Sequence, residues 1–145
     1  MNPSRRDLTA LLPALLLAEE ASAAENDVLP SKCYAFDTLP LKTNPQTHNE
    51  VRQVFTGSTH EGFPVDLHIT QLAPGQMPHP EHKHVHEEMI MLQKGTLDVT
   101  ILGKTTRLNP GSVAYVTSDE QHGWKNVGDE PAEYFVLAIG HQHKS

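Results

Sequence analysis

Four side chains of the types that bind transition metals stand in two clusters of this sequence. His82, His84 and Glu88 lie in the stretch H-K-H-V-H-E-E, and His122 lies farther on, in Q-H-G-W-K-N. Imidazole nitrogens with one carboxylate oxygen suit a first-row transition metal such as manganese, iron, nickel, copper or zinc. Four protein ligands also leave one or two positions of an octahedral ion open to water or substrate. The residue types therefore predict a metal site with an open coordination position.

The first cluster places a polar side chain at every second residue, namely at His82, His84, His86 and Glu88. Alternate side chains of an extended chain point to the same face, so we expect these four to project together. Ile90 and Leu92 continue that face as apolar residues, whereas Met89 and Met91 face the opposite way. A strand with one polar end and one apolar end on the same face is what a metal site at the mouth of a barrel requires.

His86 shares the parity of the predicted ligands, and several roles remain open for it. It could hydrogen bond to a ligand, line the pocket as an acid or base, or lie on the surface after a local bulge; we favour these roles over metal ligation. Glu88 and His86 are the candidate catalytic residues, Glu88 also being a ligand. Further acid or base candidates are His68, Tyr115 and Trp124. For His68 a hydrogen-bonded structural role is the default, and for His79, which precedes Pro80, it is a solvated loop position or the pocket rim.

The two clusters resemble the paired motifs of the cupin superfamily. The positions that match motif one are Gly75, His82, His84, Glu88 and Gly95, and those that match motif two are Gly111, His122 and Asn126. Thr117 stands where the second motif has proline and Asp119 where it has glycine. This departure weakens the turn prediction before His122 but leaves all four ligand positions occupied. The resemblance covers roughly Leu67 to Gly140.

The resemblance implies an all-β fold, a double-stranded β-helix or jelly-roll barrel, with one divalent transition metal. Manganese or iron is favoured by availability if the protein folds before export; zinc, nickel and copper remain compatible. The implied function is a metal-dependent enzyme, dioxygenase-like or else an isomerase or lyase, that acts on a small oxygen-rich organic molecule. The alternatives are a non-catalytic module that binds a small ligand or the metal, and a structural dimerisation domain, because fold does not fix function.

The pattern of short β-type runs separated by turns agrees with this fold class. The expected strands are Val51–Thr56, Val65–Leu72, Val85–Gln93, Leu97–Leu102, Thr105–Leu108, Ser112–Thr117 and Tyr134–Ile139. Tight turns are expected at 102–104, at 109–111 and at 128–131, from their glycine, asparagine and proline content. No stretch after Ala24 combines a helix cap with an amphipathic run. Many short strands of this kind favour a sandwich or a barrel.

Length and charge limit the function classes. A chain of 145 residues suits one hydrophobic core, and a net charge of −7 argues against nucleic acid or an anionic membrane as partner. No stretch is long enough to span a bilayer. The single Cys33 excludes an internal disulfide.

We expect an export signal at 1–23, an N-terminal arm at 24–48, the cupin barrel at 49–140 and a flexible tail at 141–145.

The first residues have the layout of an export signal. Arg5 and Arg6 precede an apolar run from Leu8 to Ala18, and Ala21-Ser22-Ala23 offers small residues for cleavage. The arginine pair also resembles a twin-arginine signal, and the alternative is an amphipathic or frayed N-terminal helix. We therefore expect a periplasmic or secreted protein, with a small molecule as ligand. We also expect a homodimer in which the proline-containing arm Leu29–Pro45 covers a neighbour's sheet edge.

Overall fold

The computed structural model describes residues 28–140, and the regular secondary structure of this part of the chain is almost entirely β-strand. The elements are η1 Phe36–Thr38, β1 Leu41–Thr43, β2 Glu50–Ser58, β3 Pro64–Leu72, β4 Glu87–Lys94, β5 Leu97–Ile101, β6 Lys104–Leu108, β7 Val113–Val116, β8 His122–Asn126 and β9 Ala132–Ile139. The only helical element among these residues is the single 3-10 turn η1, as the lack of helix signals predicts. All seven expected strands are present.

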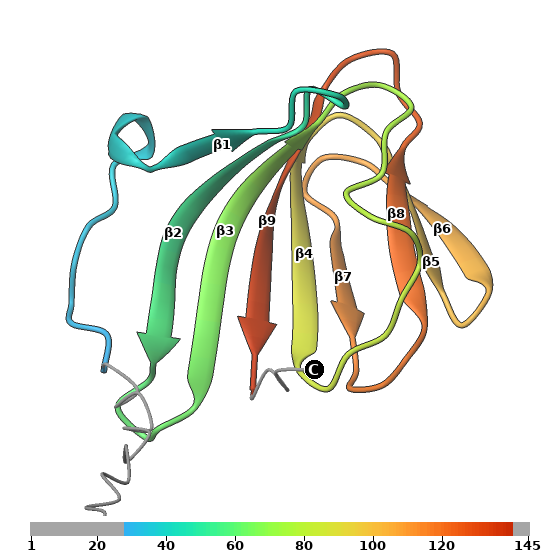
Figure 1. The fold of residues 1–145 in the computed structure, drawn as a ribbon. Coiled ribbons are helices and arrows are strands. Elements are labelled where there is room, and N and C mark those ends of the chain that lie inside the picture. The colour runs from blue at the N-terminus through green and yellow to red at the C-terminus, as the bar shows by residue number, and fades with distance from the viewer. Residues whose placement is uncertain (1–27, 141–145) are drawn as a thin grey trace, which may run out of the picture.

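The strands form two antiparallel sheets. The larger has the order β1-β2-β3-β9-β4-β7 and the smaller the order β6-β5-β8 (Figure 1). The chain passes from one sheet to the other after β4, β6, β7 and β8. Each crossing puts neighbours in sequence on opposite walls, so that β9 lies between β3 and β4. This is the predicted all-β, double-sheet jelly roll.

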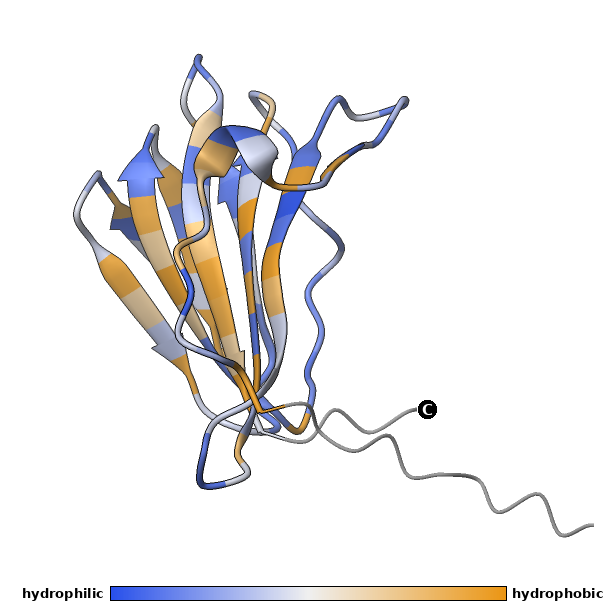
Figure 2. Cartoon of the chain, turned by 90° about the vertical axis from the view of Figure 1, so that its left-hand side faces the viewer, coloured by the Kyte–Doolittle hydropathy of each residue, from blue (hydrophilic) through white to orange (hydrophobic). Residues whose placement is uncertain are grey.

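Alternation along β4 and β9 separates the interior from the outer face. In β4, Glu88, Ile90 and Leu92 are buried, whereas the residues between them are half-buried. This confirms the predicted face, with a polar end at Glu88 and an apolar continuation. The core is formed by Leu72, Ile90, Leu92, Leu97, Val99, Leu108, Trp124, Ala132, Tyr134 and Val136. Apolar bands run along the strands, and most connecting turns are hydrophilic (Figure 2).

The segment 73–86 serves as an extra edge of the small sheet. The backbones of His82 and His122 exchange hydrogen bonds, with N–O distances of 2.9 and 2.8 Å, and Asn126 N donates to Gln76 O at 3.0 Å. Figure 1 shows this segment running alongside β8. The predicted strand Val85–Gln93 therefore starts two residues late, at Glu87, because the chain bends at 85–86 to leave the small sheet.

Two strands, β1 and β8, were not predicted from the sequence. The sequence of β8, H-G-W-K-N, has no alternation and no β-branched residue. It becomes a strand because β5 pairs with one edge and His82 with the other. Its glycine is also needed there, since a Cβ at Gly123 would lie 2.8 Å from Glu81 Cγ. Tertiary pairing, rather than local propensity, makes this strand.

The expected turns are present, and the departure from the second motif does not disrupt the turn before His122. Asp119 takes the left-handed backbone conformation, with a φ of 62°, which a glycine would adopt most easily. Asp and Asn tolerate this region better than other non-glycine residues. The Asp119 N–H donates to His84 O at 2.8 Å. The turn that precedes one predicted ligand is thus hydrogen-bonded to the backbone of another.

The described part of the arm covers an edge of the chain's own sheet. Strand β1 pairs with β2, Leu29 N donates to Ser58 O at 2.9 Å, and the Tyr34 ring lies 5.7 Å from that of Phe55. The predicted signal at 1–23 and the tail at 141–145 lie outside the described residues, so export stays a prediction. Within residues 28–140, no helix has the length and apolar character needed to cross a membrane.

Candidate metal centre

The predicted ligands come together from three parts of the fold. Glu88 comes from β4 of the large sheet, His122 from β8 of the small sheet, and His82 and His84 from the connecting segment. His122 has no exposed surface, and Glu88 is buried. One nitrogen from each of His82, His84 and His122 can be chosen so that all three lie within 4.8 Å of one another. The site therefore joins the two sheets.

Backbone carbonyls determine which nitrogen of two rings faces the centre. Nδ1 of His84 lies 2.8 Å from His86 O, and Nδ1 of His122 lies 2.8 Å from Glu120 O. A carbonyl can only accept, so each Nδ1 carries a proton, and in the neutral form of each ring the lone pair lies at Nε2. These Nε2 atoms lie 3.4 and 3.0 Å from Oε2 of Glu88. Backbone support of this kind is common for histidines that bind metals.

The arrangement fits a cation. Two nitrogen lone pairs and a carboxylate oxygen converge and repel one another unless a proton or a metal ion is shared between them. Nδ1 of His82 and Nε2 of His84 are also buried without a hydrogen-bond partner. Unpaired buried polar atoms are costly, and a bound ion would satisfy them. A set of nitrogens with one carboxylate oxygen is suited to a divalent transition metal.

His82 is held in the neutral form that metal binding requires. Burial lowers the pKa of His82 to about 4, and the nearby rings of His79, His122 and His84 add to this effect. At neutral pH no proton needs to leave this ring before an ion binds. The His79 ring packs edge-on against it, with centroids 4.1 Å apart.

His86 belongs to the cluster, although the chain bends at this point. Its ring stacks on that of His84, with centroids 3.6 Å apart and planes 8° from parallel. Ligand atoms of His84, His86 and Glu88 also lie within 4.8 Å of one another, so they form a second candidate ligand set. Burial lowers the pKa of His86, and the proximity of His84 lowers it further. The half-buried His86 ring stacked on His84 agrees with a place beside the candidate ligands rather than with a fully solvated surface position.

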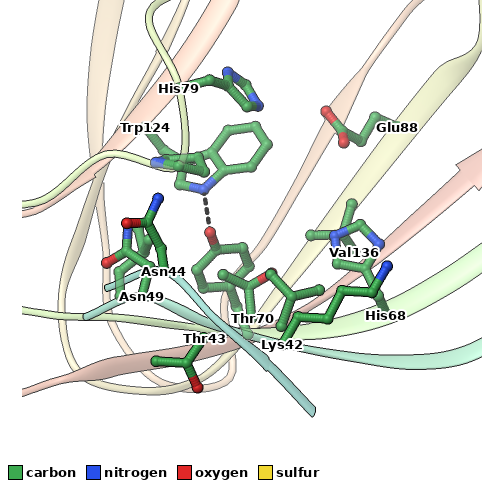
Figure 3. Close-up of a pocket in the computed structure, with 14 residues that line it drawn as sticks. Lys42, Thr43, Asn44, Asn49, His68, Thr70, His79, Glu88, Trp124 and Val136 are labelled. Carbon is green, nitrogen blue, oxygen red and sulfur yellow. Dashed lines mark hydrogen bonds between the residues drawn. The ribbon is translucent and has the colours of Figure 1, made fainter. Parts of the chain in front are cut away.

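A cavity of about 510 Å³ opens beside Glu88 between the two sheets. Trp124 and Tyr134 form part of its wall, and the indole Nε1 donates to the Tyr134 hydroxyl at 2.7 Å (Figure 3). Burial raises the pKa of Tyr134, so its hydroxyl stays protonated. Other lining residues are Lys42, Thr43, Asn44, Asn49, Val51, His68, Thr70, Leu72, Pro78, His79 and Val136. A small molecule in this cavity would lie against the predicted ligand Glu88.

The remaining candidates for an acid or base lie in different places in the structure. Trp124 and His68 line the cavity, whereas Tyr115 points to the outer face of the large sheet and is exposed. His79 is exposed, contacts His82 and lines the cavity, so it lies at the rim, one of the two positions expected for it. Asp66, which pairs with His68, was missed by the sequence analysis. The signal was available, since D-x-H within a strand places both side chains on one face.

Asn126, the last residue of the second motif, has a structural role. Its amide nitrogen donates to Leu72 O at 2.9 Å and to Glu130 O at 2.8 Å, and its Oδ1 accepts from Gly128 N at 2.9 Å. It is fully buried. These bonds connect β8 to the end of β3 and to the turn before β9. They fix the strand that carries His122.

Comparisons with known proteins agree on the family. Residues 68–139 match the family model of the cupin domain. The structure is similar to an RmlC-like cupin from Shewanella frigidimarina (TM-score 0.62, 14% identity, covering 78% of this chain and 95% of that one). It is also similar to a predicted oxalate decarboxylase from Thermotoga maritima (0.64, 16%, 76% and 100%). A third similar structure is the polyketide cyclase RemF from Streptomyces resistomycificus (0.62, 15%, 79% and 82%).

At such identities, likeness to these structures shows the fold and not the reaction. A search of the curated proteins gives no match. The family match, the jelly-roll topology and the three-histidine, one-glutamate cluster nevertheless point the same way. The chain belongs to the cupin superfamily.

Proposed function

We propose that this protein is a metal-dependent enzyme whose ion is held by His82, His84, Glu88 and His122 at the mouth of the cavity. One observation supports this above all. Two imidazoles, each fixed by a backbone carbonyl, direct Nε2 at the same oxygen of a buried carboxylate, at 3.0 and 3.4 Å. The ion is one divalent transition metal, with manganese or iron favoured.

A bound ion of this kind supplies a Lewis acid that polarises an oxygen atom of the substrate, or a centre that activates dioxygen. The protein's own residues supply the rest. Backbone carbonyls orient His84 and His122, the Trp124–Tyr134 pair forms a rigid wall, and the apolar core below excludes water. Glu88 lies on the boundary between ligands and cavity, where its carboxylate can accept a proton from a molecule bound there.

The size and polarity of the cavity support the proposed substrate class. A volume of about 510 Å³ lies in the range that takes small molecules. Hydroxyl, amide and amino groups of Thr43, Asn44 and Lys42 line it beside apolar walls. A small organic molecule with several oxygen atoms fits this lining. Two of the similar structures bear the names of a predicted oxalate decarboxylase and a polyketide cyclase, which supports an oxygen-rich carbon substrate.

The test is to load the protein with ferrous iron or manganese and to add a catechol or a 2-keto acid. We expect a change in the visible or electron paramagnetic resonance spectrum on binding, followed by oxygen uptake or by conversion without oxygen. The variant His84→Ala is the control, because it should lose both signals. Binding without turnover across such a panel would favour the non-catalytic module. No spectral change with a loaded site would contradict the proposal.

We further propose a homodimer that forms through the outer face of the large sheet. This face carries Met89 and Met91 of β4 and the exposed Val113 and Tyr115 of β7, an apolar surface that partners commonly cover. We expect light scattering at tens of micromolar to give a dimer. Tyr115→Glu should weaken it at least about tenfold, whereas Leu102→Glu on the exposed β5–β6 turn should not. A monomeric wild type would refute this.

A further inference from the structure

A second polar cluster lies beside the cavity, separate from the candidate metal ligands, and one of its two members, His68, lines the cavity wall. It consists of Asp66 and His68, which follow each other at alternate positions of β3. His68 Nδ1 lies 3.2 Å from Asp66 Oδ1, and His68 lines the cavity (Figure 3). The His68 side chain keeps 27% of its surface exposed and that of Asp66 keeps 20%, and because His68 lines the cavity, a molecule there can reach its ring.

Asp66 is held so that one oxygen remains for His68. Gln53 Nε2 donates to Oδ2 at 2.8 Å, and the Thr56 hydroxyl donates to the same oxygen. Burial alone would raise the pKa of Asp66, but the hydrogen bonds from His68, Thr56 and Gln53 outweigh it, and the pKa lies below its usual value. The ionised carboxylate can only accept. In the neutral form of His68 the proton therefore lies on Nδ1, and Nε2 carries a lone pair.

The strand register places this pair within reach of the metal centre. Asp66 and Glu88 both pair with Ala138, on opposite sides of β9. Two strand spacings separate them, about 9–10 Å, and both side chains point inward. His68 is in the next row, beside Val136. Glu88 and His68 both line the cavity, so a molecule held there can touch Glu88 at one end and His68 at the other.

We infer that His68, oriented by Asp66, is the acid and base that moves a proton at the carbon next to the carbonyl of a small 2-keto acid. This inference rests on the proposed function. In the step, the proton passes from carbon to Nε2, the C–H electron pair forms a C=C bond, and the carbonyl π pair moves onto oxygen. Return of a proton to carbon reverses it. Lys42 lines the same cavity, its amino end pointing toward His68 in Figure 3, and provides a cation for the carboxylate.

The first measurement needs no metal. Long-range proton–nitrogen NMR spectra of the full chain with labelled histidine should show His68 as the Nδ1-protonated tautomer, assigned by the loss of its signals in His68→Gln. Asp66→Asn should shift His68 towards the other tautomer, because an asparagine side chain can also donate. A His68 ring protonated at Nε2 in the wild type would overturn the inference and leave the metal proposal intact.

The second measurement follows exchange of the methyl protons of pyruvate in heavy water, with the zinc-loaded protein. We expect exchange above that of free zinc, a loss of about 100-fold or more in His68→Gln and a smaller loss in Asp66→Asn, with unchanged zinc content. His60→Gln is the matched control, since His60 is exposed outside the cavity. Wild-type exchange in His68→Gln, or none in the loaded wild type, would overturn the inference alone. Failure to bind zinc, manganese or iron would instead refute the proposed function and the inference with it.

Discussion

His84→Ala should leave the protein with little bound metal. We expect about one ion per wild-type chain, and affinity at least 100-fold lower without His84, because a water molecule in its place would not be a ligand held in position by the protein, as the ring is by His86 O. Removing the ion should also lower the melting temperature, since binding at 100 times the dissociation constant stabilises a fold by about 2.7 kcal/mol. Elemental analysis and thermal unfolding with and without a chelator measure both effects.

Companion variants test which cluster holds the ion. His122→Ala should lose metal as well, but this residue is fully buried and its loss also weakens the small sheet. His86→Ala distinguishes the two candidate ligand sets, and we expect it to retain the ion. His60→Ala provides a neutral comparison. Full occupancy in the His84→Ala, His122→Ala double variant would end the assignment of this site.

Gly95→Ala should destabilise the fold by about 3 kcal/mol or more. Gly95 has a φ of 85° in the turn from β4 to β5, a conformation that costs an alanine about 1–2 kcal/mol. A Cβ there would also lie 2.6 Å from Cα and 2.8 Å from Cβ of the fully buried Ala132. The backbone of β9 would have to move, and with it the wall of the cavity. Urea unfolding gives the change.

Gly103→Ala separates the cost of the positive φ from the cost of the steric contact with Ala132. Gly103 also has a positive φ, of 78°, but a Cβ there would meet nothing within 4 Å. We expect only the conformational cost, about 1–2 kcal/mol. Equal losses in the two variants would mean that the approach of Ala132 carries no cost. The close approach of Ala132 gives a physical reason why the first cupin motif ends in glycine at Gly95.

The fold class could be predicted from the sequence, and so could the residues that cluster in the candidate metal centre, because both depend on short-range patterns. Alternation from Glu88 to Leu92 is a local property, and it gives the correct inward face of β4. The turns at 102–104 and 109–111 follow from residues that adopt a left-handed or fixed backbone. The positive φ of Asp119 shows that the second motif tolerates a substitute for glycine when the residue accepts that conformation.

What could not be predicted depends on partners that are distant in sequence. Strand β8 exists because β5 and His82 pair with its two edges. The pairing of His68 with Asp66 needs Gln53 and Thr56 of a neighbouring strand to fix the carboxylate. In an extended strand His86 would point to the same side as the predicted ligands, whereas the chain bends at this residue and the His86 ring stacks on that of His84. Register and bends of this kind are decided by the whole sheet.

The pairing of His82 with His122 has a consequence for the order of events during folding. These residues are far apart in the chain, and Glu88 belongs to a different sheet from His122. Such distant contacts form late, after local hairpins such as β5–β6. No local fragment of the chain contains both Glu88 and a fixed His122, so a nascent or partly folded chain lacks the complete binding geometry. An ion bound at this site would therefore be acquired by the finished tertiary structure, and its retention would measure how firmly the two sheets stay closed.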